Sequence, residues 1–508
     1  MTQNIRSLST YILMNKAFIN GKWIDSLENK SFGILNPASQ KVIGNVPDLT
    51  IEQVNSSILL AHDSFDKWKK ISGKERGHIL RKWFDLMIKN KEALAALITQ
   101  ENGKTMKESL TEIELGASYI EWFSGEAPRI NGDILTSPKR EKQLLVFKEP
   151  LGVCAFITPW NFPSAMIARK VGPALAAGCT CVLKPSEETP LSALALAKKD
   201  RKKEKQKGKN KSFFFFFNKL SQEAGLPPGV FNVLTCSTKS NSDVGKLLCT
   251  HPLISKISFT GSTKIGKILL SHCSQGIKKT SMELGGNAPF IIFPSADLKK
   301  ALSGLIASKF RCSGQTCVCA NRILVHADIY DEFARLLKEE VGDMPVGPGN
   351  DPATDIGPLI NKAAADNIEA LLEDSVLKGA KVSAGGKRLG ETFFEPTVLQ
   401  HVTPDMRIYQ EEIFGPVASL IKFSTEEEAV EIANSTPFGL ASYFYSRDVE
   451  QIWRVKSSLH FGMVGINEGI ITTAEAPFGG VKYSGFGYEG SKYGIEEYLH
   501  KKYVCWSV

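Results

Sequence analysis

From about residue 150 onward, short apolar runs alternate with helical patterns, and no other feature of the sequence limits the fold as strongly. Runs of this length are typical of strands buried on both faces, and helices between such strands are typical of a parallel sheet. The runs form two series, which predicts two α/β units that divide near residue 280. The predicted strands are residues 153–158, 181–183, 230–234, 257–260, 289–293, 323–325, 399–402, 417–423 and 463–467.

Helices are expected both before and between these strands. Thr50 followed by Gln53 has the spacing of a capping box, which starts a helix. Apolar residues then recur at helical spacing, so residues 50–130 are predicted to be mainly helical and to pack through one face. Further helices are expected at residues 165–177 and near residues 328–340, 361–378 and 426–435.

The 508-residue chain has a formal net charge of +8, but the excess is confined to one segment. Ten basic and two acidic residues lie between Lys198 and Lys219, so the rest of the chain is neutral. Proteins that bind nucleic acid are normally basic over a folded face, so no nucleic-acid partner is expected. Segment 198–219 also has five consecutive phenylalanines and interrupts a predicted helix. This favours an inserted surface loop, or an error in the predicted coding sequence, over a nuclear-localisation or membrane-contact role.

Length, cysteine usage and the N-terminal residues narrow the class of protein further. A chain of this length is expected to contain two or three domains, and it has no run of about 18 uncharged apolar residues that predicts a membrane span. The ten cysteines are scattered, which fits a reducing compartment. Residues 1–16 lack acidic residues and weakly match a mitochondrial transit peptide, so a mitochondrial location is expected, with the cytoplasm as the alternative.

Two segments carry residues suited to acyl chemistry, although each also has an ordinary structural interpretation. Cys317 lies among small residues that let backbone N–H groups approach an oxyanion, but an isolated cysteine is more often buried and inert. Glu283 ends a strand-like run before two glycines, where a carboxylate can act as a general base or simply be a paired surface group. The spacing of Cys312, Cys317 and Cys319 fits no zinc site, so no metal is expected.

Two other segments suit a bound dinucleotide. A strand-like run leads into the small residues 261–263 and then a helix, where N–H groups can meet a phosphate, although the pattern is not G-x-G-x-x-G. Glu187 follows the strand that ends near Lys184. An acidic side chain there can bind ribose hydroxyls and repels a 2′-phosphate, which favours NAD over NADP.

Six motifs in a fixed order together resemble the aldehyde dehydrogenase superfamily, from about Ala17 to the C-terminus apart from segment 198–219. They are ITPWNFP (157–163), KPSEETP (184–190), FTGSTKIG (259–266), MELGG (282–286), GQTC (314–317) and EEIFGPV (411–417). This resemblance implies an α/β fold with two doubly wound α/β domains, a Rossmann-like cofactor domain and a catalytic domain, plus a small β oligomerisation element. The implied limits are residues 1–132 and 153–282 for NAD binding, 283–485 for catalysis, and 133–152 with 486–508 for assembly into a homodimer or homotetramer.

The resemblance also implies roles for individual residues. Cys317 matches the catalytic nucleophile, Glu283 the general base that activates water, and Asn161 the amide of the oxyanion hole. The implied contacts to NAD are Lys184, Pro185, Ser186 and Glu187 at the adenosine ribose, Gly261, Ser262, Thr263, Lys264, Ile265 and Gly266 at the pyrophosphate, and Glu412 and Phe414 at the nicotinamide.

The substrate expectation depends on two arginines. Arg169 lies eight residues after Asn161, and Arg311 lies six residues before Cys317. Two guanidinium groups near one thiol suit a substrate carboxylate, because arginine binds carboxylates through two hydrogen bonds. Both positions resemble the succinate-semialdehyde dehydrogenases, where these arginines bind the substrate, and Thr472 stands where that group usually has a pocket serine.

The sequence therefore predicts oxidation of succinate semialdehyde to succinate through a thiohemiacetal and a thioester on Cys317, as in 4-aminobutyrate degradation. The alternatives are a dehydrogenase for another aldehyde such as glutarate semialdehyde, an inactive member disabled by segment 198–219, and a thiol esterase without a cofactor. Cys319 is a redox candidate, because a disulfide to Cys317 would remove the nucleophile. In an extended segment the two sulfurs would be too far apart without a rearrangement of the loop.

Overall fold

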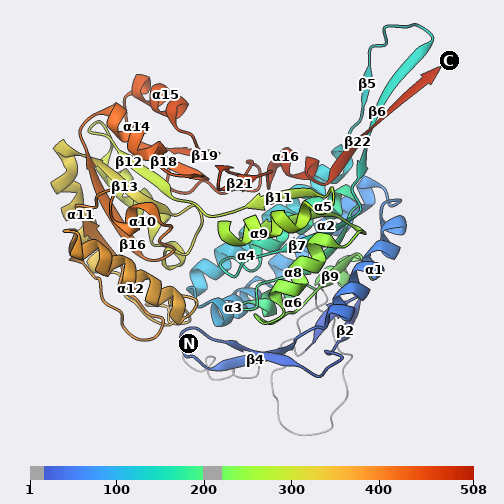
Figure 1. Ribbon diagram of the computed structural model, residues 1–508, viewed down its shortest axis with the longest axis horizontal. Coiled ribbons are helices and arrows are strands. Elements are labelled where there is room, and N and C mark those ends of the chain that lie inside the picture. Colours follow the sequence, from blue (N-terminus) through green and yellow to red (C-terminus); the bar gives the residue numbers. More distant parts are fainter. Residues whose placement is uncertain (1–15, 198–219, 508) are drawn as a thin grey trace.

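The computed structural model describes residues 16–197 and 220–507. The expected transit peptide and the expected inserted loop therefore lie outside the described residues. The described chain forms two α/β domains and a three-stranded sheet that projects from the first domain (Figure 1).

The first domain is built on an eight-stranded sheet. Five neighbouring strands, namely β9, β8, β7, β10 and β11, run parallel as predicted. The strands at the two edges, β1 with β2 and β21, join antiparallel, which the sequence pattern did not reveal. In spatial order the strands are β2 (Lys22–Ile24), β1 (Ala17–Ile19), β9 (Phe231–Val233), β8 (Thr180–Lys184), β7 (Val153–Ile157), β10 (Ile254–Thr260), β11 (Lys279–Glu283) and β21 (Gly485–Phe486).

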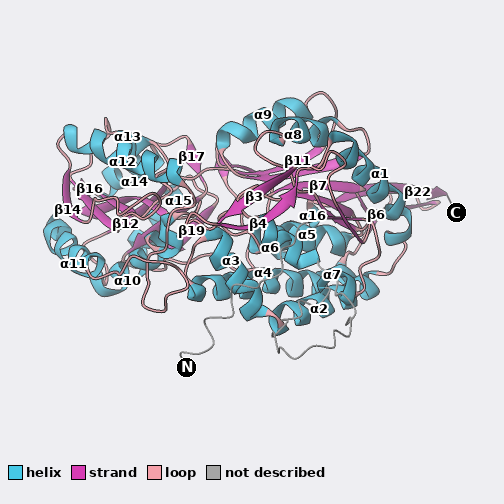
Figure 2. Ribbon diagram, turned by 90° about the horizontal axis from the view of Figure 1, so that it is seen from below, coloured by secondary structure: helices cyan, strands magenta, loops and turns pink. Residues whose placement is uncertain are grey.

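Helices cover both faces of this sheet (Figure 2). Alternate residues of β7 serve the two cores: Phe156 belongs to the core formed mainly with α2 to α7, and Ala155 to the core formed with α1, α8 and α9. The capping box at Thr50 and the helix end at Gly178, which has a φ of +99°, match the sequence pattern. The helices are α1 (Ile51–Trp68), α2 (Gly73–Lys89), α3 (Lys91–Asn102), α4 (Met106–Glu126), α5 (Ala165–Ala177), α6 (Pro190–Ala197), α7 (Leu220–Ala224), α8 (Asn241–Thr250), α9 (Thr263–Cys273) and α16 (Ser491–Glu496), with the 3₁₀ turn η2 (Ala127–Arg129).

The second domain has a seven-stranded sheet. It is parallel except for the antiparallel edge strand β14, and the apolar pattern did not predict β18, which lies between β12 and β19. In spatial order the strands are β14 (Lys381–Ala384), β15 (Thr397–Gln400), β16 (Val417–Phe423), β13 (Ala320–His326), β12 (Ala288–Ile292), β18 (Ala441–Tyr445) and β19 (Met463–Ile466).

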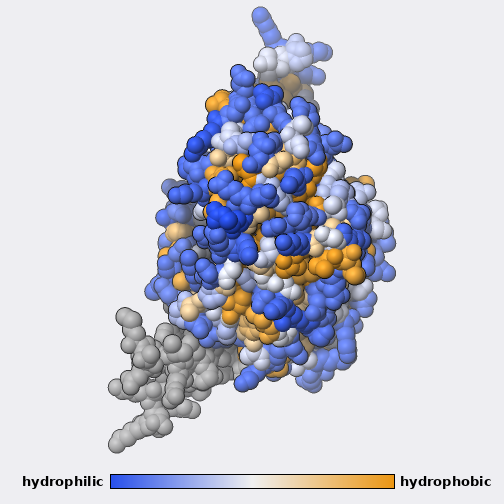
Figure 3. Space-filling view, turned by 90° about the vertical axis from the view of Figure 1, so that its left-hand side faces the viewer, coloured by the Kyte–Doolittle hydropathy of each residue, from blue (hydrophilic) through white to orange (hydrophobic). Residues whose placement is uncertain are grey.

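Helices also cover both faces of the second sheet, and the outer end of this domain is mostly hydrophilic, with apolar residues in separate groups (Figure 3). The helices are α10 (Leu298–Lys309), η3 (Arg311–Gly314), η4 (Ala327–Ile329), α11 (Tyr330–Gly342), α12 (Lys362–Leu377), α13 (Arg407–Gln410), α14 (Glu426–Asn434) and α15 (Val449–Ser458).

Smaller sheets complete the molecule. The projecting sheet has the order β22 (Leu499–Ser507), β6 (Lys142–Pro150) and β5 (Asp133–Leu135) (Figure 1). The expected oligomerisation range 486–508 is divided in the structure, because Phe486 pairs with β11 and α16 packs against α4 and α5, while only β22 joins β6. Two short pairs remain, β3 (Ser31–Leu35) with β4 (Val42–Pro47) and β17 (Phe438–Gly439) with β20 (Val481–Lys482).

Candidate functional site

One edge of the first sheet gathers four of the predicted segments. β8 ends at Lys184 and β7 at Ile157, which are paired; β10 ends at Thr260 and β11 at Glu283, which are also paired. Because these strands are parallel, their carboxyl ends lie at the same edge of the sheet, the usual place for a ligand in α/β folds. Asn161 follows β7 at this edge.

The second domain meets this edge with the amino ends of two parallel neighbours, β13 and β16. β13 begins three residues after Cys317, and β16 begins directly after residues 412–416. Across the junction, Asn161 Nδ2 donates a hydrogen bond to the carbonyl oxygen of Gln315 at 3.0 Å. The expected oxyanion amide and the loop of the expected nucleophile are therefore in direct contact.

Buried polar atoms that lack a hydrogen-bond partner among the described residues are concentrated at this junction. They include both carboxylate oxygens of Glu283, Oδ1 of Asn161 and Oγ1 of Thr316. They also include Nη2 of Arg169 and Nε of Arg311. Leaving such a group unpaired costs about 1–3 kcal/mol, so a concentration of them indicates a place where a polar ligand binds.

Cys317 is half-buried at this junction. Burial raises its pKa to about 12; the positive charge of Arg169 opposes this rise, and the negative charges of Glu412 and Glu283 add to it. The sulfur is therefore protonated at neutral pH. A proton acceptor is needed before it can act as a nucleophile.

Glu283 belongs to a buried group of charges that sequence reasoning missed. Its side chain is 2% exposed, and burial together with the charge of Glu489 raises its pKa well above the usual value. Glu489 forms ion pairs with Arg169 and Lys170, and these hold its own pKa below the usual value although burial opposes this. Lys170 and Glu489 are 319 positions apart, so no local pattern in the sequence connects them.

The turn after β10 fits the pyrophosphate of a dinucleotide. Ser262 caps α9, whose N–H groups begin at this turn. A Cβ atom at Gly261 would lie 2.5 Å from the ring of Phe259, and one at Gly266 would lie 2.5 Å from the Leu284 side chain. A side chain at either position would therefore clash with the packing of this turn.

The end of β8 fits the ribose of the same ligand. The buried Nζ of Lys184 donates to the carbonyl oxygen of Pro185 at 3.2 Å and lies 3.9 Å from Oε2 of Glu187. Ser186 Oγ accepts the N–H of Glu188 at 3.2 Å. An ammonium and a partly exposed carboxylate thus lie together at the strand end, where ribose hydroxyls bind in folds of this class.

Glu412 and Phe414 lie on the other side of the junction. Glu412 Oε1 accepts the N–H of Gly286 at 2.9 Å, and burial raises the pKa of this carboxyl to about 7. Phe414 has a φ of +51°, and its ring meets that of Trp160 edge to face at 5.5 Å. The segment therefore contacts the loop that follows β11, through Gly286, and the loop that follows β7, through Trp160.

The two expected substrate arginines differ in their surroundings. Arg169, in α5, is buried, and its existing ion pair with Glu489 is a partner that the sequence did not predict. Its positive charge opposes the rise that burial causes in the pKa of Cys317. Arg311 is partly exposed in η3, with its guanidinium 6.0 Å from the ring of Phe162.

Thr472 and Cys319 lie at the margin of the junction. Thr472 is partly buried in the loop after β19, where the next residue accepts a hydrogen bond from Tyr119 Oη at 3.4 Å. Cys319 is buried, and its thiol donates to the carbonyl oxygen of Lys309 at 3.4 Å. Its N–H donates to the carbonyl of Thr316 at 3.2 Å, so a turn, not an extended segment, contains Cys317.

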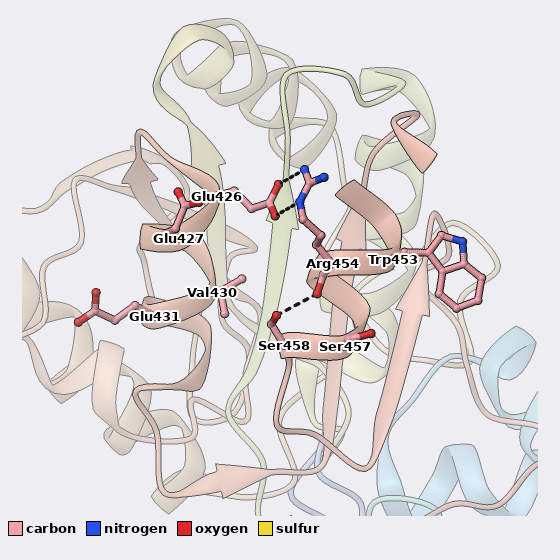
Figure 4. A pocket seen from close by; sticks show the side chains of 8 residues that line it. All are labelled: Glu426, Glu427, Val430, Glu431, Trp453, Arg454, Ser457 and Ser458. Atoms are coloured by element: carbon pink, nitrogen blue, oxygen red, sulfur yellow. Dashed lines mark hydrogen bonds and ion pairs between the residues drawn. The ribbon is translucent and has the colours of Figure 1, made fainter. Parts of the chain in front are cut away.

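An open groove on the second domain, of about 710 Å³, lies between α14 and α15 and is lined by none of the predicted site residues. Arg454 donates two hydrogen bonds of 2.9 Å to Glu426 there, and both are drawn in Figure 4. Within residues 16–197 and 220–507, no group of three or more metal-binding side chains is placed to hold a metal ion. In the same ranges, every helix is too short or too polar to cross a membrane.

Comparison with known proteins gives matches along nearly the whole chain. The model of the aldehyde dehydrogenase family matches residues 23–202 and 205–504. The chain is 52% identical over 498 residues to the mitochondrial succinate-semialdehyde dehydrogenase of Rattus norvegicus, covering 97% of this chain and 91% of the relative. It is 48% identical over 496 residues to the 3-sulfolactaldehyde dehydrogenase of Pseudomonas putida, covering 97% of both.

Solved structures have the same fold. The crystal structure of an E. coli NADP-dependent enzyme gives a TM-score of 0.92 at 47% identity, covering 97% of this chain and 98% of that one. A betaine aldehyde dehydrogenase of Staphylococcus aureus in complex with NAD+ gives a TM-score of 0.90 at 34% identity, covering 97% and 95%. The predicted α/β fold is confirmed.

Proposed function

The chain belongs to the aldehyde dehydrogenase family, and from this premise we propose that it oxidises succinate semialdehyde to succinate with NAD as cofactor. The observation that carries the proposal is the junction where Cys317, Asn161 and Glu283 meet with unpaired polar atoms. The 52% identity to a succinate-semialdehyde dehydrogenase supports the substrate.

Cys317 is the nucleophile in this proposal. Its sulfur forms a bond to the aldehyde carbon while the carbonyl π electrons move to oxygen, and its proton passes to Glu283. The developing alkoxide is stabilised by the backbone N–H of Cys317 and by Asn161 Nδ2, whose present acceptor is the Gln315 carbonyl. The raised pKa values of Cys317 and Glu283 support a proton transfer between them, because an unionised thiol needs a nearby acceptor.

The cofactor is held by the residues that fit a dinucleotide, namely Lys184 and Glu187, the turn at residues 261–266, and Glu412 with Phe414. When bound, the nicotinamide supplies a hydride acceptor, so that the thiohemiacetal carbon is oxidised to a thioester. Glu283 first releases to solvent the proton that it took from Cys317, and it then removes a proton from a water molecule whose oxygen attacks the thioester carbon. The C–S bond breaks, the carboxylic acid leaves, and Glu283 passes the proton from water to the Cys317 sulfur, which restores the thiol.

Arg311 and Arg169 bind the substrate's carboxylate, with Thr472 at the pocket wall. The ion pair of Arg169 with Glu489 involves Nε, and its Nη2 has no hydrogen-bond partner within the described chain. The guanidinium can therefore keep Glu489 and still donate to a substrate. Buried guanidinium donors without partners are a strong reason to expect an anion.

NAD, not NADP, is the proposed cofactor. The carboxylate of Glu187 near Lys184 favours ribose hydroxyls and repels a 2′-phosphate. The NAD+ complex of the Staphylococcus aureus enzyme agrees with this choice, whereas the related E. coli enzyme is described as NADP dependent. Rates with the two cofactors decide between them.

Oxidation of 3-sulfolactaldehyde is a second candidate. The relative from Pseudomonas putida is 48% identical over nearly the whole chain. A sulfonate is an anion that guanidinium groups bind as they bind a carboxylate, so the arginines alone do not separate the two substrates.

The test is the steady-state rate of NADH formation by the full chain. We expect kcat/KM to be highest for succinate semialdehyde with NAD, lower for glutarate semialdehyde and 3-sulfolactaldehyde, and lowest for butanal, which has no anionic group. A higher value for butanal would overturn the anion-binding assignment. NAD binding without turnover of any aldehyde would identify an inactive member, and ester hydrolysis without NAD would identify a thiol esterase.

Location and assembly complete the proposal. A mitochondrial location is supported by the name of the rat relative, and import of the full chain into isolated mitochondria tests it. A homodimer or homotetramer is supported by the projecting sheet, whose exposed apolar side chains include Ile134 at 84% and Trp506 at 57%. Light scattering of the purified chain tests the assembly.

Cys319 remains a proposed redox residue. A disulfide to Cys317 would break the Cys319–Lys309 hydrogen bond and open the turn that now joins Thr316 to Cys319. We expect peroxide to inactivate the chain reversibly and Cys319→Ser to remove the reversal by reductant. Equal activity before and after peroxide would contradict this role.

A further inference from the structure

The loop of Asn161 is fixed through its backbone by a buried ion pair. Lys104 Nζ donates to the carbonyl oxygen of Asn161 at 2.6 Å and to Oε2 of Glu112 at 2.7 Å. The other oxygen of Glu112 accepts the backbone N–H of Ser164 at 2.8 Å. The Lys104 and Glu112 side chains are 2% and 0% exposed, so the pair forms a closed bridge around this loop.

The same helix start also holds the loop of the nucleophile. Glu108 lies one turn before Glu112 on α4, and its Oε1 accepts the backbone N–H of Cys312 at 2.6 Å. Its Oε2 accepts the N–H of Thr105 at 2.9 Å, which completes a capping box and fixes the carboxylate. The carbonyl of Cys312 in turn accepts Gln315 Nε2 at 3.3 Å. The first two turns of α4 thus bind both sides of the junction.

A stabilising role alone does not account for this arrangement. Burying an ion pair carries a desolvation penalty that often exceeds the attraction between the charges, and apolar replacements of similar volume are frequently as stable. Here every hydrogen-bond partner of the two side chains is either the other charge or a backbone group of residues 161–165, and Lys104 Nζ also lies 3.9 Å from the centre of the Phe162 ring. The contacts therefore fix the position of a loop whose side chain must be accurately placed.

We infer that Lys104 and Glu112 are positioning residues that hold the Asn161 amide at the distance from Cys317 needed to stabilise the alkoxide. This inference rests on the proposed function. The inference adds a conformational requirement to the proposed function: the side-chain amide of Asn161 is a good donor only while Lys104 binds the backbone carbonyl oxygen of Asn161. A displacement of about 1 Å at such a site can reduce a rate by on the order of 10²-fold.

The first test removes the ion pair without leaving a buried charge. Lys104→Met alone leaves the carboxylate of Glu112 unpaired, so the double variant Lys104→Met/Glu112→Gln is made as well. Glutamine is chosen at position 112 because its side-chain oxygen still accepts the Ser164 N–H. We expect the first-turnover formation of NADH to slow by about 10- to 100-fold in the double variant. The Kd for NAD and the thermal unfolding midpoint should stay near the wild-type values.

A double-mutant cycle separates positioning from a general structural role. If Lys104 acts through Asn161, adding the double variant to Asn161→Ala should lower the activity by less than about threefold relative to Asn161→Ala alone. A loss as large as in the wild-type background would overturn the inference, and so would an unchanged first-turnover rate in the double variant itself.

Lys91→Met is the matched control, because Lys91 also pairs with a glutamate of α4, Glu114 at 2.9 Å, but on the surface. This variant should keep the wild-type first-turnover rate. A wild-type chain that turns over no aldehyde would overturn both the proposed function and the inference. An active wild type with an unaffected Lys104→Met/Glu112→Gln variant would overturn the inference alone.

Discussion

The junction between the two domains and the groove between α14 and α15 hold polar groups in opposite ways. At the junction, Glu283, Asn161 and Arg169 are buried and carry polar atoms that are unpaired within the described residues. In the groove, Glu426 and Arg454 are paired through two hydrogen bonds (Figure 4), and the Arg454 side chain is 55% exposed. A concave surface by itself is therefore a weaker indication of a ligand site than buried and unpaired polar groups.

The difference follows from what each region must do. An exposed ion pair contributes little to stability, and its polar groups need no ligand to complete their hydrogen bonds. Unpaired buried groups are costly in the folded protein unless a ligand, water or transition state completes their hydrogen bonds. Variants in the two regions should thus differ strongly in their effect on activity.

The largest effect is expected for Cys317→Ser. Dehydrogenase activity should fall on the order of 10⁵-fold, because a hydroxyl is a much weaker nucleophile than a thiol and the nucleophile cannot be bypassed. NADH formation measures the loss, and the Kd for NAD should be retained. Cys505→Ser, which changes an exposed cysteine, is the control; equal losses in both variants would contradict the assignment.

Asn161→Ala should have the next largest effect. Loss of one oxyanion donor typically lowers kcat by about 10²–10³-fold, or about 3–4 kcal/mol. The KM for the aldehyde should change much less, because the amide is needed most in the transition state. A change confined to KM would show that Asn161 binds the ground-state substrate instead.

Activity should increase with pH between pH 6 and pH 9, by up to about tenfold per pH unit. Cys317, with a pKa of about 12, is protonated at neutral pH, and burial raises the pKa of Glu283 well above its usual value. Raising the pH favours the thiolate and the carboxylate, which are the reactive forms. The pH profile of kcat/KM is the measurement, and a profile that falls above pH 7 would contradict this prediction.

Arg311→Met should raise the KM for succinate semialdehyde by about tenfold or more, because a charged hydrogen bond to the carboxylate is lost. The KM for butanal should stay within about twofold. The ratio of the two values is the informative quantity. An equal increase for both aldehydes would mean that Arg311 supports the loop and does not bind the carboxylate.

The smallest effect is expected in the groove. Arg454→Met should leave kcat/KM unchanged and shift the thermal midpoint by less than about 3 °C, because the arginine is exposed. Steady-state kinetics and thermal unfolding check both values. A clear loss of activity would mean that this groove communicates with the junction.

The fold followed from the sequence where strands are buried on both faces. Such strands leave continuous apolar runs, as in β7, β10 and β16, and these were predicted within a few residues. β18 was missed because Ser442 and two tyrosines interrupt its apolar character. Ser442 is nevertheless fully buried, since its Oγ donates to the carbonyl of Met463 at 3.3 Å.

The site followed from the sequence only in part. The motifs pointed to Cys317, Glu283 and Asn161, and the structure brings their segments together. They gave no indication that Lys104 and Glu112 hold the Asn161 loop, because those contacts go to backbone atoms, which are present in every residue type.

By itself, the sequence determined the family and the alternation of buried strands with helices, and it led to the side chains that we propose to react, because these depend on local spacing and residue chemistry. Tertiary structure alone decided which charges face one another: Glu489 with Arg169 and Lys170, and Lys104 with the Asn161 loop. The physical reason is that electrostatic and hydrogen-bonding partners are set by distance in space. The separation of two residues along the chain does not predict whether they are such partners where two sheets meet at their edges.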